Sequence, residues 1–532
     1  MALVLVSGCS CSCRQNPAVD AGVAGPDADW LAGRLPLETG TPKKGGTLTV
    51  RLPLEPAGLT RLHDRFNEGT MARITVGPIY ETLDALSEKV VESDDHLTLT
   101  ITLKKGIVFH DGTPLTSNDV KATLGVILDE RFPTSTLRTS LEHFDQLQFP
   151  DERTVIFRWK KPYFLANHTL LTAIPIMPAA AIAGPVEAFD TLPIHRAPIG
   201  TGPFKFEKWE PGVSLTYVRA DDRAFVDKIV FRIVKDDTAA MTALEKGEFD
   251  LFIRLTPAAW RSIESQRWAF TGYRRITFAE NAYAWIGFNQ RKPLFASKNV
   301  RRALAMLYPS ETIEKTVDLG LEPRTSCPWM EGTTSCDPSV KPIAFDPAGA
   351  KTLLASDGWK DSDGDGVLDR EGVKFSFAFL IAAQSVKMNK LVPIYLDTLR
   401  QASIDARIET VDVSAYMSRV RAHDFDAMAL SWAAADSLQD NFANFHSSQA
   451  DAGNDFLGYA NPDVDALLER IRTELDPTAR AALERQAHKL IFEDQAYLFM
   501  GRRPSLDLAK RSVHGLVPSL RGYDLAKVWL AP

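Results

Sequence analysis

Alternating apolar and polar residues constrain the first half of the chain, because a period of two predicts strands that are buried on one face. The apolar positions are Leu48, Val50 and Leu52; Leu97, Leu99, Ile101 and Leu103; Val155, Phe157 and Trp159; and Ile229, Phe231 and Ile233. Strands of this kind need partners in a sheet and a core beneath one face. The first half is therefore predicted to be rich in sheet.

The second half has more helix signals. Three helices are predicted to begin at Asx-Pro pairs, which are Asp346-Pro347, Asn461-Pro462 and Asp476-Pro477. The Asx side chain caps free N–H groups, and proline at the first helical position lacks a donor that would have no partner. With 532 residues, 45% hydrophobic and 24% charged, the chain has a globular composition and room for about two to four domains. We predict an α/β or α+β chain of several lobes.

Composition and missing motifs exclude several classes of function. The formal net charge of -7 argues against a nucleic-acid binder, which usually has a basic face. No apolar run approaches the roughly 18 residues of a membrane span. The sequence contains no G-x-S-x-G, H-E-x-x-H, Walker or G-x-G-x-x-G motif, and its histidines are scattered. An enzyme, such as a peptidase, is therefore disfavoured.

The N-terminus resembles a lipoprotein cleavage box. Small residues precede Cys9, whose thiol would carry the lipid. The stretch that follows, up to residue 44, is rich in Ala, Gly and Pro, which is typical of a flexible tether. Only eight uncharged residues precede Cys9, whereas a signal peptide needs a positive start and a longer apolar core. Two interpretations stay open: the start of the chain is truncated, or the box is accidental.

Two other features involve cysteines and acidic residues. Cys327 and Cys336 are the only cysteines in the body of the chain, which favours a small-loop disulfide; two unpaired thiols are the alternative. Oxygen ligands at Asp361, Asp363, Asp365 and Asp369, with glycine at the sixth position, follow the calcium-loop pattern. Gly372 replaces the glutamate expected at position 12, so a solvated turn is the other interpretation. No other cofactor is predicted.

Five segments, in order, resemble the peptide/nickel-type extracellular solute-binding proteins of ABC transporters. They are residues 103–120 (LKKGIVFHDGTPLTSNDV), 198–206 (PIGTGPFKF), 227–250, 285–304 and 458–468. The resemblance implies a two-lobed periplasmic-binding-protein-like α/β fold, with an extra inserted domain and hinge closure over a central cleft. It places lobe I at 45–75, 185–275 and 500–532, the inserted domain at 76–184 and lobe II at 276–499, after the 1–44 tether.

The resemblance also implies a ligand site. Peptide binders of this family commonly place an aspartate after a tryptophan-containing strand to pair with the ligand's amine, and the matching residues are Trp432 and Asp436. The usual position of that aspartate is Ala435 here and the usual Asp-Pro is missing, so Asp436 is either a shifted anchor or a solvated loop carboxylate. Further candidates for the cleft are Glu55, Tyr283, Trp285 and Asn289; the alternatives are a surface charge for Glu55 and core packing for the others.

The function that the resemblance implies is capture of a small solute, in particular a peptide, for the permease subunits of an ABC importer. The protein would act without catalysis, as a monomer that binds no nucleic acid, on the periplasmic side of the cell envelope and lipid-anchored through Cys9. Two alternatives stay open: a ligand-binding sensor module of the same fold, and a binder of a nickel complex, a sugar or another non-peptide solute.

Overall fold

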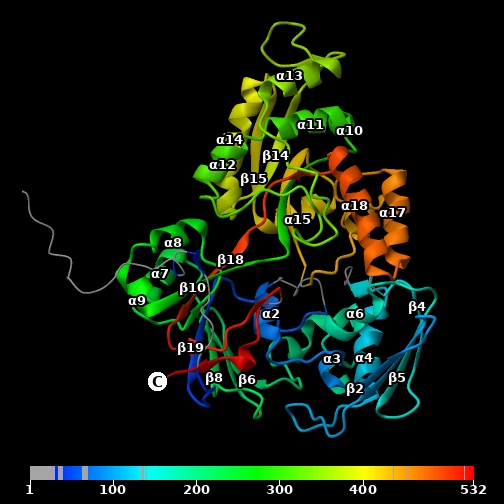
Figure 1. Cartoon of the computed structure of the whole chain (residues 1–532), viewed down its shortest axis with the longest axis vertical. Coiled ribbons are helices and arrows are strands. Elements are labelled where there is room, and N and C mark those ends of the chain that lie inside the picture. Colours follow the sequence, from blue (N-terminus) through cyan, green and yellow to red (C-terminus); the bar gives the residue numbers. More distant parts are fainter. Residues whose placement is uncertain are drawn as a thin grey trace, which may run out of the picture.

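The structure, a computed structural model, describes residue 30 and residues 32–33, 40–62, 70–132, 137–138, 141–434, 436–451, 453–520 and 522–531. Figure 1 shows three sheets with their helices: one in the upper half, one at the lower left and one at the lower right. We refer to them below as lobe II, lobe I and the inserted domain, respectively. Within the described residues, no helix is long and apolar enough to cross a membrane.

Lobe I is built on a seven-stranded mixed sheet that gathers distant parts of the chain. Its strands, in spatial order, are β10 (Tyr273–Ala279), β18 (Pro504–Lys510), β9 (Leu251–Phe252), β1 (Thr47–Leu52), β8 (Lys228–Ile233), β7 (Ser214–Arg219) and β6 (Phe204–Glu210). The predicted strands at 48–52 and 229–233 become β1 and β8, which pair in parallel. Helices α7 (Asp237–Glu245), α8 (Pro257–Ser262) and α9 (Arg267–Gly272) contribute to a core cluster with β9, β10 and β18.

The inserted domain has an antiparallel four-stranded sheet. Its order is β2 (Ser87–Glu92), β3 (Thr98–Leu103), β5 (Thr154–Trp159) and β4 (Phe144–Gln148), with helices α3 (Leu83–Leu86), α4 (Ser117–Leu128) and α6 (Ala166–Thr172). A capping box begins α4, because Thr116 accepts from the N–H of Asn118 and Asp119 accepts from the N–H of Thr116.

Lobe II has a five-stranded sheet and most of the helices. The strand order is β15 (Asp405–Val411), β14 (Ser376–Ala382), β16 (Ala427–Ala433), β11 (Ala282–Phe288) and β17 (Leu498–Phe499). The helices are α10 (Pro293–Ala296), α11 (Lys298–Met306), α12 (Ser310–Thr316), α13 (Pro347–Ser356), α14 (Val386–Gln401), α15 (Val413–Arg421), α16 (Phe442–Phe445), α17 (Pro462–Thr473) and α18 (Pro477–Glu493). Asp346, Asn461 and Asp476 cap α13, α17 and α18 as predicted.

Short elements complete the described chain. They are α2 (Thr70–Val76), the strand pairs β12 (Asp369–Arg370) with β13 (Val373–Lys374), β19 (Val513–His514) with β22 (Trp529–Leu530), and β20 (Pro518–Ser519) with β21 (Gly522–Tyr523), and the 3-10 helices η2 (Ala179–Ile182), η3 (Val186–Thr191), η4 (Pro193–His195), η5 (Ser447–Gln449) and η6 (Leu525–Lys527).

Packing of the cores groups the three sheets into two bodies. One hydrophobic cluster runs through lobe I and the inserted domain, and it includes Leu48 and Phe231 of the first sheet and Leu99 and Phe157 of the second. Lobe II has clusters of its own. The inserted domain therefore shares its core with lobe I, and a cleft can open only against lobe II. The exact segment boundaries drawn from the sequence stay a prediction.

Two of the family-like segments contact each other through His110. The ring Nδ1 of His110 accepts from the N–H of Gly200 at 3.3 Å, and its ring Nε2 lies 2.9 Å from the carbonyl oxygen of Gly202. The backbone N–H of His110 donates to the carbonyl oxygen of Gly200. Burial lowers the pKa of His110, which favours the neutral ring that these contacts require. The histidine thus has a structural role and fixes the 200–203 loop beside residues 78–79.

A disulfide links Cys327 to Cys336, and His488 of α18 holds both ends of the loop that it closes. His488 Nδ1 accepts from the N–H of Asp337 at 3.0 Å, and Nε2 lies 3.1 Å from the Ser326 carbonyl oxygen. The ring is fully buried, and this burial lowers the pKa of His488 to about 4. The folded protein therefore needs this histidine to be neutral.

This histidine makes stability depend on pH. The unfolded chain takes up the proton near pH 6.5 and the folded chain only near pH 4, so the free energy of unfolding is expected to fall by up to about 3 kcal/mol over that interval, from this group, as pH is lowered. Urea unfolding at several pH values measures this. His488→Gln should flatten the slope, whereas His96→Gln, at an exposed position, should not. Equal slopes for His488→Gln and wild type would contradict the assignment.

Candidate functional site

A cavity of about 650 Å³ lies where the two lobes and the inserted domain meet. Its wall is formed by residues from seven parts of the chain. They are Arg61; Arg73, Val76, Gly77, Pro78, Tyr80, Glu81 and Thr82; Leu165, His168, Thr169, Thr172, Ala173 and Pro175; Pro203 and Arg223; and Ala434, Asp436, Leu438, Ser519 and Tyr523 to Lys527. This volume falls in the range of small-molecule sites, which are commonly found between domains.

Asp436 lies on the wall of this cavity, in the loop that follows β16. Its backbone carbonyl accepts from the Asn281 side-chain amide at 2.6 Å, and its Oδ1 accepts from the N–H of Ser437 at 2.7 Å. Its Oδ2 lies 2.8 Å from Nε2 of His168 on α6. Since Asn281 lies between β10 and β11, the carboxylate is held close to the point where the chain passes from lobe I to lobe II.

Other charged groups of the wall are paired with one another. Glu81 lies 2.7 Å from the guanidinium of Arg223, and Asp524 lies 3.5 Å from the ammonium of Lys527. Arg73 donates to the carbonyl of Leu520 at 3.2 Å. The cavity therefore carries charges of both signs along its wall, which suits a ligand that is itself a zwitterion.

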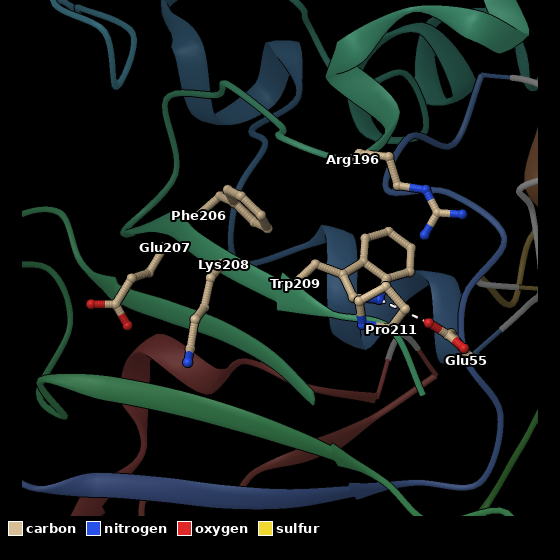
Figure 2. Close-up of a pocket in the computed structure, with 7 residues that line it drawn as sticks. All are labelled: Glu55, Arg196, Phe206, Glu207, Lys208, Trp209 and Pro211. Carbon is tan, nitrogen blue, oxygen red and sulfur yellow. Dashed lines mark hydrogen bonds between the residues drawn. The ribbon is translucent and has the colours of Figure 1, made fainter. Parts of the chain in front are cut away.

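Glu55 lies elsewhere, in a more open pocket of about 600 Å³ on lobe I (Figure 2). Its Oε1 accepts from Trp209 Nε1 and from the N–H of Gly212, both at 3.0 Å. The guanidinium of Arg196 covers the Trp209 ring, with its carbon 4.0 Å from the ring centroid. Glu55 follows β1, and its carboxylate is bound within lobe I to Trp209 of the edge strand β6; it is not among the residues that line the interlobe cavity.

Tyr283, Trp285 and Trp432 belong to one aromatic cluster inside lobe II. Trp285 stacks on Tyr497 with the ring centroids 3.9 Å apart, and Trp432 packs against Trp285 at 5.8 Å. Tyr283 and Trp285 are buried, whereas Trp432 is half-buried and not among the residues that line the cavity. The ring contact between Trp285 and Trp432 joins the neighbouring strands β11 and β16. This position corresponds to the core-packing alternative for the β11 aromatics.

Asn289 also has a structural role, because its side chain binds backbone groups of lobe II. It is buried, and its side-chain amide donates to the carbonyls of His423 and Phe425, both at 3.0 Å. Its Oδ1 accepts from the N–H of Arg291. These bonds hold the loop before β16 against the end of β11, so the geometry gives no support to a cleft role for Asn289.

A cluster of polar residues outside the cavity joins the inserted domain to lobe II, and we call its four residues Glu142, Tyr163, Asp440 and Arg472 the interlobe clasp; the Glu142 side chain is half-exposed. Arg472 on α17 contacts Glu142 at 2.7 Å and Asp440 at 3.0 Å, and the Tyr163 hydroxyl donates to Asp440 at 2.8 Å. The side chains of Arg472 and Asp440 are 4% and 8% exposed. Burial raises the pKa of Asp440, and the Arg472 guanidinium opposes this effect. In Figure 1, α17 stands directly above the inserted domain.

The acidic loop brings carboxylates of Asp361, Asp363 and Asp369 within 4.8 Å of one another. The Lys374 ammonium lies among them, 2.6 Å from Asp363 and 2.8 Å from Asp365. Calcium would have to displace this ammonium, and the calcium site stays a prediction. Cys9, the predicted lipidation site, lies outside the described residues.

A family model, described as bacterial extracellular solute-binding proteins, family 5 Middle, matches residues 83–454. The oligopeptide-binding protein AppA of Bacillus subtilis (strain 168) is 26% identical over 514 residues, which cover 92% of this chain and 93% of AppA. Protein XP55 of Streptomyces lividans is 28% identical, over 91% of this chain and 89% of XP55.

Solved structures agree with these sequence matches. AppA of Bacillus subtilis, solved in complex with a nonapeptide, superposes with a TM-score of 0.81 at 25% identity, covering 92% of this chain and 100% of that one. The periplasmic binding protein DppA of Helicobacter pylori, in complex with the peptide STSA, has the same fold, with a TM-score of 0.79, 20% identity and 92% and 99% of the two chains covered. The predicted two-lobed α/β fold is confirmed, and the chain belongs to the bacterial extracellular solute-binding proteins, family 5.

Proposed function

We propose that the interlobe cavity captures a short peptide and that Asp436 receives its amino terminus. The observation that carries this proposal is the Asp436 carboxylate on the wall of a cavity of about 650 Å³ between two lobes. An ammonium placed in such a site needs an opposite charge close by. The nonapeptide complex of AppA, the relative that is 26% identical over most of its length, supports a peptide over other solutes.

The remaining parts of the proposal concern the setting in the cell. The protein would deliver its ligand to the permease subunits of an ABC importer, act as a monomer without catalysis, and stand on the periplasmic side of the envelope, anchored by a lipid on Cys9. Membership of an extracellular solute-binding family supports the location, and the sequence motif at Cys9 supports the anchor.

Native mass spectrometry of the full chain, purified without denaturation, tests the ligand class. A set of co-purified masses that fragment as peptides is the expected result. A single non-peptide mass would overturn the peptide assignment and leave the solute-binding family untouched. Such a result has precedents among proteins of this fold, since NikA of Brucella suis was solved with Fe(III)-EDTA.

Asp436→Asn is expected to weaken binding of these peptides about ten- to hundredfold, because a charge-assisted contact to the amine becomes a neutral one. Titration calorimetry with a co-purified peptide measures the change. Asp451→Asn, at an exposed carboxylate that does not line the cavity, should bind as the wild type does. Equal affinity of Asp436→Asn and wild type would show that Asp436 is a solvated loop carboxylate.

A further inference from the structure

His168 faces Asp436 across the cavity. Its Nε2 lies 2.8 Å from Oδ2 of the carboxylate, and both side chains are about one-third exposed, at 30% and 29%. Both residues line the cavity, so the contact is made inside the proposed ligand site. The imidazole therefore already contacts the carboxylate that a ligand amine would need.

Contacts on each side hold this pair in place. On α6, the Thr172 hydroxyl donates to the His168 carbonyl at 2.9 Å, and the Trp159 indole donates to the Asn167 side chain at 3.2 Å. On the opposite side, the amide of Asn281 holds the backbone of Asp436. Because α6 belongs to the inserted domain and Asp436 to lobe II, the contact joins the two bodies that a ligand must enter between.

The other carboxylates of the wall are less available to a ligand amine, because each already has a cation of the protein close by. Glu81 is paired with Arg223, which also binds Asp221 and the carbonyl of Thr201. Asp524 is near Lys527 and accepts from the N–H of Ala526. An incoming amine at Asp436, in contrast, meets an imidazole that is supplied by the opposite wall.

We infer that His168 competes with the ligand's amino group for Asp436 and so sets how tightly the protein holds ligands with a free amine. This inference rests on the proposed function. The binding free energy that a ligand gains at Asp436 is only the difference between the free energy of its own contact and that of the His168 contact that it replaces. His168 is thus a specificity-determining residue: it penalises weak donors and admits a ligand whose ammonium replaces the imidazole.

Substitutions of His168 test this in both directions. The probe is an equimolar mixture of random tetrapeptides, with free or with acetylated amino termini, titrated by native mass spectrometry. His168→Ala should lower the half-saturating concentration of the free-amine mixture by up to about fivefold, which corresponds to the loss of one competing hydrogen bond. His168→Lys places a fixed ammonium against Asp436 and should raise it. The acetylated mixture should respond to neither change, and His96→Ala, at an exposed histidine, should leave all values as in wild type.

Weaker binding of the free-amine mixture by His168→Ala would overturn the inference, because the imidazole would then contact the ligand favourably. The inference would also be overturned if His168→Ala improved binding of the free-amine mixture equally in the Asp436→Asn background. The effect of His168 is expected to require the Asp436 carboxylate.

Imidazole ¹⁵N spectra separate this outcome from failure of the proposed function. The His168 signals should shift on Asp436→Asn without any ligand and shift again when the free-amine mixture is added. If the wild-type protein binds neither the free-amine nor the acetylated peptide mixture, both the proposed function and the inference are overturned. Peptide binding that leaves the His168 signals unchanged overturns the inference alone.

Discussion

Arg472→Ala is expected to open the ligand-free protein and to lower its free energy of unfolding by about 3–5 kcal/mol, the cost of leaving a buried charge without its partner. The change removes the ion pairs to Glu142 and Asp440 and the guanidinium that lies 4.7 Å from the Tyr163 ring centroid and 4.5 Å from that of Phe442. Small-angle scattering reports the opening as a larger radius of gyration, and urea unfolding reports the stability.

Arg470→Ala is a matched control, since Arg470 lies two residues away on α17 with an exposed side chain. It should match the wild type in both measurements. An unchanged radius for Arg472→Ala together with lost stability would mean that the clasp only supports folding. An unchanged radius and unchanged stability would mean that the clasp contributes nothing measurable.

Gly200→Ala is expected to cost about 3 kcal/mol or more of stability and to abolish ligand binding. A Cβ at this position would lie 2.0 Å from the carbonyl oxygen of Ile79, and one at Gly202 would lie 2.5 Å from that of Pro78. Backbone would have to move to make room, and Pro78 and Pro203 form part of the cavity wall. Urea unfolding and peptide titration measure the two effects.

Gly125→Ala provides the comparison for that substitution. Gly125 lies inside α4, and a Cβ there would meet nothing within 4 Å. Alanine is a better helix former than glycine by up to about 1 kcal/mol, so this variant should be slightly more stable than the wild type. Equal stability of Gly200→Ala and wild type would show that the loop shifts at little cost.

The parts of the fold that depend on neighbouring residues could be predicted from the sequence. Period-two alternation located β1, β3, β5 and β8, and the Asx-Pro pairs located the starts of α13, α17 and α18, because caps and alternation act within a few residues. The loop with Asp436 was placed by its resemblance to a known family, and in the structure it lines the interlobe cavity.

The aromatic residues of β11 show where such patterns stop being informative. Tyr283 and Trp285 pack into one cluster of lobe II, and Ile286 and Phe288 pack into another, so this strand is buried on both faces. An inner strand of this kind has no alternation of apolar and polar residues, so its sequence does not distinguish a side chain that faces a ligand from one that packs in the core. Only the sheet order, with β11 between β16 and β17, decides the matter.

The contacts that no sequence pattern indicated are those between residues far apart in the chain. His168 and Asp436 are separated by 268 positions, and Glu142 and Arg472 by 330. Each is an ordinary polar residue in its local segment. Their roles arise from the way the two bodies face each other, which local periodicity and capping do not encode.

The position of β18 in the sheet of lobe I has a consequence for how the chain acquires its structure. This strand comes from residues 504–510, yet it lies between β10 and β9 and pairs with both. During synthesis the inserted domain can complete its sheet from residues 87–159 alone, whereas lobe I must wait for nearly the whole chain. Until then β9 and β10 lack the partner that β18 supplies, and unpaired strand edges of this kind make a nascent chain prone to aggregation.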